Sequence, residues 1–250
     1  MIELPTDFKI EPQSLEGQTA LVTGGTTGIG RATARLLAFH GCQVVIFGRT
    51  EDHLADALAA IGGDHIGLVA DVGDRADLEG VFETVDQRLG RLDILINNAA
   101  VSGEGPMSTP YAEMEYIVRV NLLGYLHAAQ LAAERMIKAG RGAIINIGSM
   151  SADEREADSS IYVATKAAIQ GFNAAFAKEV NHRGIRVCLI EPGAAGSDMN
   201  ENTPERQAEL QKAGKLMTSE DIAAAVLFCL RFPLRTDIVS LRLRPHLLEE

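Results

Sequence analysis

The chain has 250 residues, of which 46% are hydrophobic, so it is long enough for one α/β domain or two small ones. Asp and Glu outnumber Lys and Arg by 34 to 23, and the formal net charge of −11 argues against nucleic acid or a membrane as a partner. The three cysteines form no CxxC pair and the six histidines are scattered, which indicates a reduced protein without a metal site. The start of the chain lacks a signal-peptide pattern, and a soluble, cytoplasmic protein is expected.

Short apolar runs alternate with amphipathic stretches along nearly the whole chain. The predicted strands cover residues 19–22, 43–47, 65–70, 92–96, 142–147, 185–190 and 237–241. The predicted helices cover about 29–40, 51–61, 75–89, 109–138 in two pieces, 160–184 and 219–230. This alternation predicts one doubly wound parallel sheet of about seven strands with helices on both faces, joined by right-handed crossovers.

Polar residues next to the predicted helices are candidate caps and boundaries. Asp74 is expected to cap the third helix, Ser159 or Ser160 the helix that begins near residue 160, and Ser219 the last helix. Residues 1–17 are polar and contain two prolines, so they are predicted to be an N-terminal arm before a single domain at 18–250. The polar segment 194–217 is predicted to be a long loop with a short helix.

A glycine cluster follows the first predicted strand and opens the first predicted helix. Gly24, Gly28 and Gly30 lie in this turn. Glycines there let the backbone turn tightly and approach a pyrophosphate, whose charge is stabilised at the helix N-terminus. The sequence therefore predicts a dinucleotide site at the carboxyl ends of the strands.

Tyr162 and Lys166 are four residues apart at the start of a predicted helix, so they share one helix face. An ammonium near a phenol favours the phenolate, lowers the Tyr pKa and provides a proton donor or acceptor near neutral pH. The alternative is a pair that only packs and is solvated. Ser149 ends the fifth predicted strand and flanks the same crossover, so it can meet this pair.

In their order along the chain, these motifs resemble the short-chain dehydrogenase/reductase family from about residue 17 to 243. The family's glycine motif, its NNAG turn, its helical asparagine, its serine, its YxxxK pair and its Pro-Gly all have counterparts. These are Thr23, Gly24, Gly28 and Gly30; Asn97, Asn98, Ala99 and Ala100; Asn121; Ser149; Tyr162 and Lys166; and Pro192 and Gly193, with Ser197 where the family often has Thr. The resemblance implies a Rossmann-type fold with one NAD(P)-binding catalytic domain.

The resemblance also implies an enzyme that transfers a hydride between the nicotinamide and a carbonyl or secondary alcohol carbon. Tyr162 would be the general acid or base, and Ser149 would hold the substrate oxygen. Lys166 would lower the pKa of Tyr162 and hold the nicotinamide ribose. Asn121 would bind a water that links Lys166 to solvent, or it is a satisfied amide in an apolar helix.

The cofactor site is expected to include the glycine loop and several other strand ends. Asp71 would bind the adenine or merely cap a helix, and Asn98 would contact the cofactor or mainly hold its turn. The complete expected set is Thr23, Gly24, Thr26, Thr27, Gly28, Ile29, Gly30, Arg49, Thr50, Asp71, Val72, Asn98, Ala99, Tyr162, Lys166, Pro192, Gly193 and Ser197.

The end of the second predicted strand carries Gly48 and Arg49 instead of a carboxylate that would bind the ribose hydroxyls. A guanidinium there favours the 2′-phosphate, so NADP(H) is predicted over NAD(H). The alternative is a solvent-facing Arg49 with NAD bound through other contacts. The charged stretch 151–158 is interpreted as a solvated rim, or as a segment in which Arg155 contacts a polar substrate.

A small carbonyl or alcohol compound is the expected partner, and the resemblance implies a homotetramer or homodimer. The 194–217 loop is expected to fold over the substrate, and a simple ketone, a sugar or polyol, and a 3-oxoacyl thioester all remain open. A second hypothesis is a catalytically inactive dinucleotide-binding sensor or structural protein on the same fold. Such a protein has no reason to keep Asn121, Ser149, Tyr162 and Lys166 together.

Overall fold

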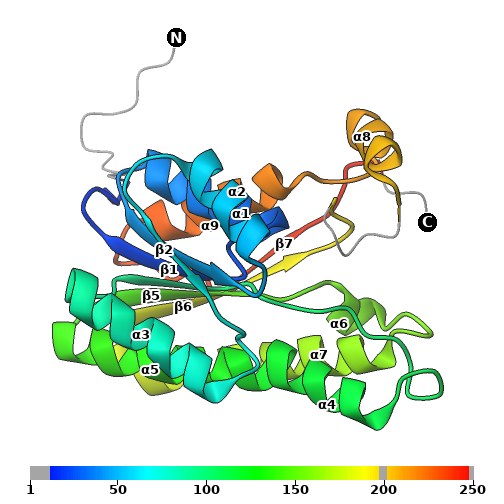
Figure 1. The fold of residues 1–250 in the computed structure, drawn as a ribbon, viewed down its shortest axis with the longest axis horizontal. Coiled ribbons are helices and arrows are strands. Elements are labelled where there is room, and N and C mark those ends of the chain that lie inside the picture. The colour runs from blue at the N-terminus through cyan, green and yellow to red at the C-terminus, as the bar shows by residue number, and fades with distance from the viewer. Residues whose placement is uncertain (1–11, 197–201, 248–250) are drawn as a thin grey trace.

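Seven parallel strands form one sheet in a computed structural model, which describes residues 12–196 and 202–247 (Figure 1). The strand order is β3-β2-β1-β4-β5-β6-β7, and each neighbouring pair is parallel. This confirms the doubly wound sheet expected from the alternation of strands and helices. The strands are β1 Thr19–Thr23, β2 Gln43–Gly48, β3 Ile66–Val69, β4 Ile94–Asn97, β5 Gly142–Ile147, β6 Ile185–Pro192 and β7 Ser240–Leu243.

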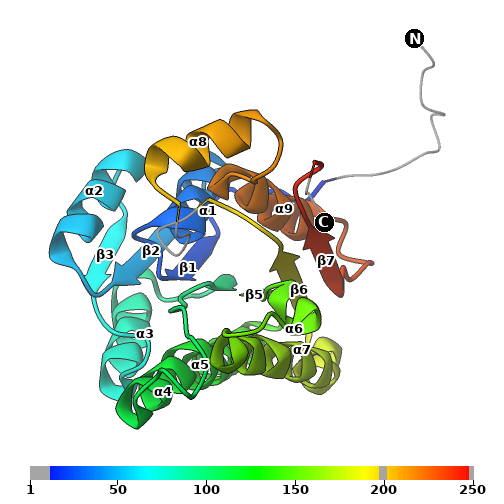
Figure 2. The ribbon, with the colours of Figure 1, turned by 90° about the vertical axis from the view of Figure 1, so that its right-hand side faces the viewer.

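Helices cover both faces of the sheet (Figures 1 and 2). One layer holds α1 Gly28–Phe39, α2 Glu51–Ile61 and α9 Ser219–Arg231. The other layer holds α3 Arg75–Leu89, α4 Tyr111–Val118, α5 Gly124–Ala139 and α7 Ser160–Val180. Two further helices are α6 Ser151–Glu154, which lies near the ends of β5 and β6, and α8 Pro204–Lys212, which lies on the side of α1 and α9. Among the described residues, no helix is long and apolar enough to cross a membrane.

The central strands are apolar on both sides because each side meets a helical layer. Ala20 and Val22 of β1 pack in the core that includes α1 and α9, whereas Leu21 packs in the core that includes α3 and α5. All three side chains have no measurable exposure. The period-two geometry of a strand therefore divides one apolar run between two hydrophobic cores.

The long helical region between β4 and β5 is interrupted by one wide turn. Residues Arg119–Leu123 form a π-helical turn that joins α4 to α5. The prediction of two helical pieces is thus correct, and Asn121 lies in the turn between them. Such turns locally disturb the hydrogen-bond ladder of a helix and often accompany functional sites.

The bounds of the last strand and the cap of the last helix are predicted wrongly, and the cap of α3 is predicted correctly. The last strand is Ser240–Leu243 and not 237–241, because residues 240–243 pair with the end of β6 while Asp237 accepts a hydrogen bond from Asn181. Thr218, not Ser219, caps α9 in a reciprocal capping box with Asp221. Asp74 caps α3 as predicted.

The segment just before β1 belongs to the domain and is not part of a separate arm. Leu15 is only 3% exposed and lies in the core. The Gln13 amide donates to the carbonyl of Arg231 at the end of α9 over 2.8 Å. The arm predicted at 1–17 is therefore wrong for residues 13–17, and residues 1–11 lie outside the described part of the chain.

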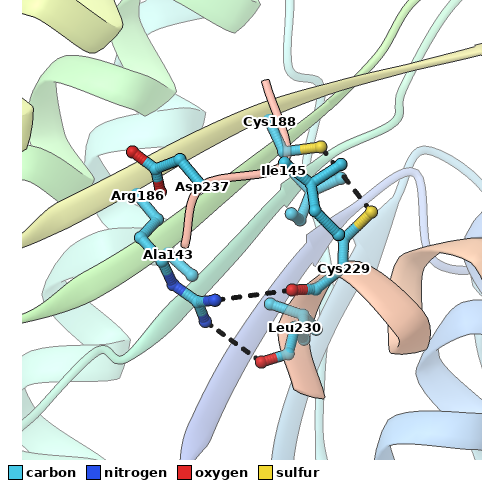
Figure 3. Close-up of a pocket in the computed structure, with 8 residues that line it drawn as sticks. Ala143, Ile145, Arg186, Cys188, Cys229, Leu230 and Asp237 are labelled. Carbon is cyan, nitrogen blue, oxygen red and sulfur yellow. Dashed lines mark hydrogen bonds between the residues drawn. The ribbon is translucent and has the colours of Figure 1, made fainter. Parts of the chain in front are cut away.

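A partly buried arginine on β6 supports the C-terminal end of α9 (Figure 3). The Arg186 guanidinium donates to the carbonyls of Leu230 at 3.0 Å, Phe232 at 3.3 Å and Cys229 at 3.5 Å. Burial lowers the pKa of Arg186, and nearby Asp237 opposes this shift. Carbonyls in the last helical turn have no partners within the helix, so Arg186 supplies donors that water would otherwise supply.

Replacing Arg186 by Met should lower the free energy of unfolding by about 1–3 kcal/mol, because buried carbonyls lose their donor. Chemical denaturation measures this loss. The control Arg183→Met, at an exposed position of the same segment, should change stability by less than about 0.5 kcal/mol. Equal losses in the two variants would contradict the capping role of Arg186.

Candidate active site

The glycine loop after β1 is tied to the turn after β4, where neighbouring crossovers leave the sheet in opposite directions. Thr23 Oγ1 accepts hydrogen bonds from the amides of Asn98 at 2.9 Å and Ala99 at 3.0 Å. The Asn98 side chain donates to the carbonyls of Thr23 at 3.0 Å and Gly24 at 3.1 Å. Asn98 therefore holds the turn, which is one of the two roles considered for it.

The glycine loop has the backbone geometry and the open helix end that a pyrophosphate requires. Gly24 has a positive φ of 61°, and a Cβ there would lie 2.9 Å from the Ala99 Cα. A Cβ at Gly30 would collide with the carbonyl of Gly24. Within the described residues, the Thr27 side chain makes no cap bond to α1, and the first turn of α1 has no acidic residue. The backbone amides there remain suited to an anion, so these residues fit a dinucleotide.

Three side chains form a hydrogen-bonded chain on the side where the adenosine is expected. Arg49 Nη1 donates to the Tyr116 hydroxyl over 2.6 Å, and that hydroxyl donates to Asp71 Oδ2 over 2.9 Å. The guanidinium carbons of Arg49 and Arg119 lie 5.7 and 5.8 Å from the Tyr116 ring centroid. Arg49 therefore has a protein partner and does not simply point into solvent. Burial and the Asp71 carboxylate raise the pKa of Tyr116.

Sequence reasoning missed Tyr116, and no pattern in the chain signals it. It is 67 residues from Arg49 and 45 from Asp71. Its helix α4 was predicted, but the direction of one tyrosine on that helix depends on packing against the segment after β3. A Cβ at Gly73 would lie 3.5 Å from the Tyr116 ring, which locates the ring beside that segment.

The other predicted cofactor residues lie at the same strand ends. Thr26 and Val72 are buried, Thr50 is the N-cap of α2, and Ile29 lies in the first turn of α1. Pro192 ends β6, and the Gly193 amide donates to the carbonyl of Leu243 on β7 over 2.7 Å. Ser197 lies outside the described residues.

Ser149, Tyr162 and Lys166 meet at the carboxyl end of β5, as their spacing predicts. Ser149 follows this strand, and its hydroxyl lies close enough to that of Tyr162 to lower the pKa of the phenol. Lys166 Nζ lies 5.6 Å from the centroid of the Tyr162 ring. Both residues of this pair are in the first two turns of α7. The N-cap of this helix is Ser159, but its hydroxyl donates to the Gly103 carbonyl over 3.4 Å and makes no cap bond among the described residues.

The expected lowering of the Tyr162 pKa is not what the structure gives. Burial raises the pKa of Tyr162, the hydrogen bond from Ser149 opposes this, and the negative charge of Glu156 adds to it. Lys166 is itself so deeply buried that its pKa is lowered to about 7. Four-residue spacing predicted the shared helix face correctly, but it could not show that both groups lose their hydration there.

Among the described residues, Lys166 has two hydrogen-bond partners, and neither is a carboxylate. Its Nζ donates to the carbonyl of Ile147 over 2.9 Å and to the Tyr125 hydroxyl over 3.4 Å. Nζ also lies 5.1 Å from the centroid of the Tyr125 ring. Sequence reasoning missed Tyr125 too. The available signal was its place four residues after Asn121, which puts both on one face of the helical region.

Asn121 is a satisfied core amide in this structure. Its Oδ1 accepts from the Val101 amide and its Nδ2 donates to the Val101 carbonyl, both over 2.8 Å. Nδ2 also lies 3.4 Å from Thr165 Oγ1 on α7. These bonds hold the chain after β4 against α7, so the side chain matches the second of the two roles considered for it.

Charged residues of the 151–158 stretch join a network around the end of β6. Arg242 of β7 contacts Asp153 at 2.5 Å and Glu191 at 3.0 Å. Gln170 of α7 donates to the same Glu191 over 2.7 Å. Glu191 is 1% exposed, so these partners replace the water that its carboxylate would otherwise contact. This part of the stretch is therefore an ion-paired border of the site, whereas Arg155 is exposed.

A separate cleft of about 600 Å³ lies at the amino-terminal ends of the strands. Its charges largely neutralise one another. Asp93 accepts from the Thr19 amide at 2.9 Å and from Arg91 at 2.5 Å, and Arg141 lies 3.7 Å away. Within residues 12–196 and 202–247, no group of three His, Cys, Asp or Glu side chains could hold a metal ion. The candidate catalytic residues Ser149, Tyr162 and Lys166 lie at the opposite edge of the sheet, at the carboxyl ends of the strands.

Comparison with known proteins agrees with this geometry. A family model described as short chain dehydrogenase matches residues 18–208. The chain is 36% identical to a Bos taurus protein named 3-oxoacyl-[acyl-carrier-protein] reductase over 223 residues, covering 87% of this chain and 93% of the relative. It is 37% identical over 220 residues to a protein of that name from Haemophilus influenzae, covering 86% and 90%.

Among solved structures, a 3-ketoacyl-(acyl-carrier-protein) reductase from Brucella melitensis, complexed with NADH, superimposes with a TM-score of 0.85. That protein is 26% identical, and the match covers 93% of this chain and 99% of the other. The family match, the relatives above 30% identity and the arrangement at the strand ends lead to one conclusion. The chain belongs to the short-chain dehydrogenase/reductase family of NAD(P)-dependent oxidoreductases that act on carbonyl and hydroxyl groups.

Proposed function

We propose that the protein reduces a carbonyl compound with NADP(H), with Tyr162 as the proton donor. The observation that carries this proposal is the meeting of Ser149, Tyr162 and Lys166 at the end of β5, at the same sheet edge as the glycine loop. A bound nicotinamide dinucleotide would supply the hydride. The protein would supply position and electrostatics.

The protonated phenol of Tyr162 suits it to act as an acid. Its raised pKa keeps the proton on the hydroxyl at neutral pH. The Ser149 hydroxyl lies beside it, so a carbonyl oxygen held between the two hydroxyls would have a proton donor within reach. As negative charge develops on that oxygen, Tyr162 gives up its proton and Ser149 keeps the oxygen in place.

Lys166 would stabilise the phenolate that remains on Tyr162. Its ammonium lies near the Tyr162 ring in a buried environment, where charge interactions are stronger than in water. The phenolate exists only after proton transfer, so this attraction favours the later state over the starting state. Lys166 thereby makes Tyr162 a stronger acid during the reaction than it is at rest.

Two parts of the chain would hold the cofactor. The amides at the start of α1, with Gly24 and Gly30 permitting close approach, would bind the pyrophosphate. Arg49 and Asp71 would bind the adenosine end, and Arg49 would give the preference for NADP(H) through its charge. This preference is supported by the absence of a carboxylate at Gly48 and Arg49, where β2 ends.

The names of the relatives favour a 3-oxoacyl thioester as the substrate to test first. A simple ketone and a sugar or polyol are the comparison substrates. The proposal extends to a cytoplasmic homotetramer or homodimer with one catalytic domain, in which the 194–217 segment covers the substrate. Residues 204–212 of that segment form α8, which lies on the side of the sheet that carries α1 and α9 (Figures 1 and 2).

Replacing Tyr162 by Phe should lower kcat for carbonyl reduction by about 10²-fold to 10⁴-fold, because the proton donor is lost. NADPH absorbance with acetoacetyl-coenzyme A as substrate measures the rate. The control Tyr111→Phe, at an exposed position, should retain the rate of the parent. Turnover of Tyr162→Phe as fast as the parent would remove Tyr162 from the mechanism. If the unmodified protein bound NADPH but reduced none of the three substrate classes, the hypothesis of a catalytically inactive sensor would be favoured.

Replacing Arg49 by Ala should raise the Kd for NADPH by about 10-fold to 100-fold, because a charge-assisted contact to the 2′-phosphate is lost. The Kd for NADH should change by less than about 3-fold, since NADH has no such phosphate. Fluorescence titration with each cofactor measures both constants, and Arg88→Ala, exposed at the end of α3, controls for net charge. An equal loss for NADPH and NADH would contradict the assignment.

The pH dependence of kcat/KM for reduction should report the ionisation of Lys166, since this ratio reflects groups of the free enzyme. The ammonium is charged below its pKa of about 7 and neutral above it, so kcat/KM should fall as the pH rises through about 7. Lys166→Met should have a low rate and lack this decline. A parent rate that is flat across neutral pH would argue against the need for a charged Lys166.

A further inference from the structure

Tyr125 is a fully buried tyrosine that contacts Lys166 of the candidate active site. It lies in the first turn of α5, and its exposed fraction is 0%. Its hydroxyl donates to the carbonyl of Ile147, the last residue of β5, over 3.0 Å. That carbonyl is also the 2.9 Å acceptor of Lys166 Nζ.

The Tyr125 hydroxyl is arranged to accept a hydrogen bond from Lys166. Its only proton is directed at the Ile147 carbonyl, so its oxygen presents a lone pair to the ammonium, which lies 3.4 Å away. Burial raises the pKa of Tyr125 well above its ordinary value, and the neighbouring Tyr162 adds to this. The hydroxyl therefore stays neutral throughout the pH range of an enzyme assay.

The backbone of Tyr125 is fixed by a series of buried asparagines. Asn97 of β4 donates to the Tyr125 carbonyl at 3.1 Å and to the Asn146 side chain at 3.0 Å. Asn146 of β5 in turn donates to Asn173 of α7 at 2.9 Å. All three asparagines are almost completely buried. These bonds join β4, β5 and α7, although Asn97 Oδ1 itself accepts no hydrogen bond among the described residues. The strands between α5 and α7 therefore help to hold the distance between Tyr125 and Lys166.

Several ionisable groups on other elements around α7 have partners other than Lys166. Glu156 acts on the pKa of Tyr162, whereas for Lys166 burial is the cause of its lowered pKa. Glu191 of β6 and Asp153 of α6 are both paired with Arg242. Tyr116 of α4 is hydrogen-bonded to Asp71 and Arg49, and the Arg119 guanidinium lies over the Tyr116 ring. The Tyr125 hydroxyl and the Ile147 carbonyl are thus the polar groups that stabilise the ammonium.

We propose that Tyr125 is a positioning residue for Lys166, whose hydroxyl keeps the buried ammonium charged and in place beside Tyr162. This inference rests on the proposed function in so far as Lys166 serves the reaction. Without the hydroxyl, the ammonium would keep one carbonyl acceptor in a site from which water is largely excluded, and the neutral amine would be favoured. Lys166 would then lose its charge at a lower pH.

Tyr125→Phe tests the proposal, because it removes the hydroxyl and keeps the ring. Lysine labelled with ¹³C at Cε allows the titration of Lys166 to be followed by NMR in the protein without cofactor, and Lys166→Arg assigns its signal. The midpoint for Lys166 should fall by about one pH unit in Tyr125→Phe, the size expected for one hydrogen bond to a charged group. The control Tyr111→Phe should leave the midpoint unchanged. Tyr125→Met, which also lacks an acceptor hydroxyl, provides a second variant and should shift the midpoint in the same direction.

The second measurement is the pH profile of kcat/KM for reduction in the same variants. The decline at rising pH should move to lower pH by the same amount as the NMR midpoint, which a purely structural loss would not produce. An unchanged midpoint in folded Tyr125→Phe would overturn the proposal, whatever the activity. If the NMR midpoint of Lys166 shifted but the pH profile of kcat/KM did not, Tyr125 would still be shown to stabilise the Lys166 ammonium. The same result would count against the role of Lys166 in the proposed function.

Discussion

The Lys166 ammonium is buried, and no carboxylate in the described part of the chain is its partner; the surrounding structure depends on this constraint. A buried cation is costly unless other groups replace its hydration. Here the end of β5 gives a carbonyl and α5 gives a hydroxyl, 2.9 and 3.4 Å from Nζ. The buried asparagines Asn97, Asn146 and Asn173 hold these elements together. A carboxylate in the same place would keep the lysine charged at all neutral pH values, but it would also repel the phenolate of Tyr162.

Local patterns in the sequence predict the fold well, because strands and helices have different periods and this chain follows both. The apolar runs of β1, β2 and β5 and the glycines after β1 are local signals, and the structure follows them closely. The errors fall where the pattern is weak. The last strand is short and half exposed, so its boundaries depend on pairing with β6 and not on its own residues. The cap of α9 was predicted one residue late because Thr218 and Ser219 are both good caps.

The candidate site was predictable as a set of residues, but not as an electrostatic environment. Spacing places Tyr162 and Lys166 on one face, and strand order brings Ser149 to them. The direction of each pKa shift depends on how much water reaches the groups, and that follows from packing by distant segments such as α5. The contact of Arg49 with Tyr116 joins positions 67 residues apart and has no trace in local sequence. Asn121 shows the same limit, since it lies in a helical turn and its partner is the backbone of Val101, in the segment after β4.

Arg242 lies on β7, which is an edge strand of the sheet next to β6. Its charge therefore affects how this edge can pair with other strands. An edge strand offers free backbone groups to any other strand that approaches, and natural sheets discourage such addition with short strands and charged side chains. β7 has four residues and carries Arg242, and the opposite edge strand, β3, also has four residues and contains Gly67. The guanidinium that neutralises buried Glu191 therefore also makes this edge a poor template for aggregation. Replacing Arg242 with an apolar residue would remove the partner of a buried carboxylate. It would also leave the sheet edge more prone to pair with strands of other molecules.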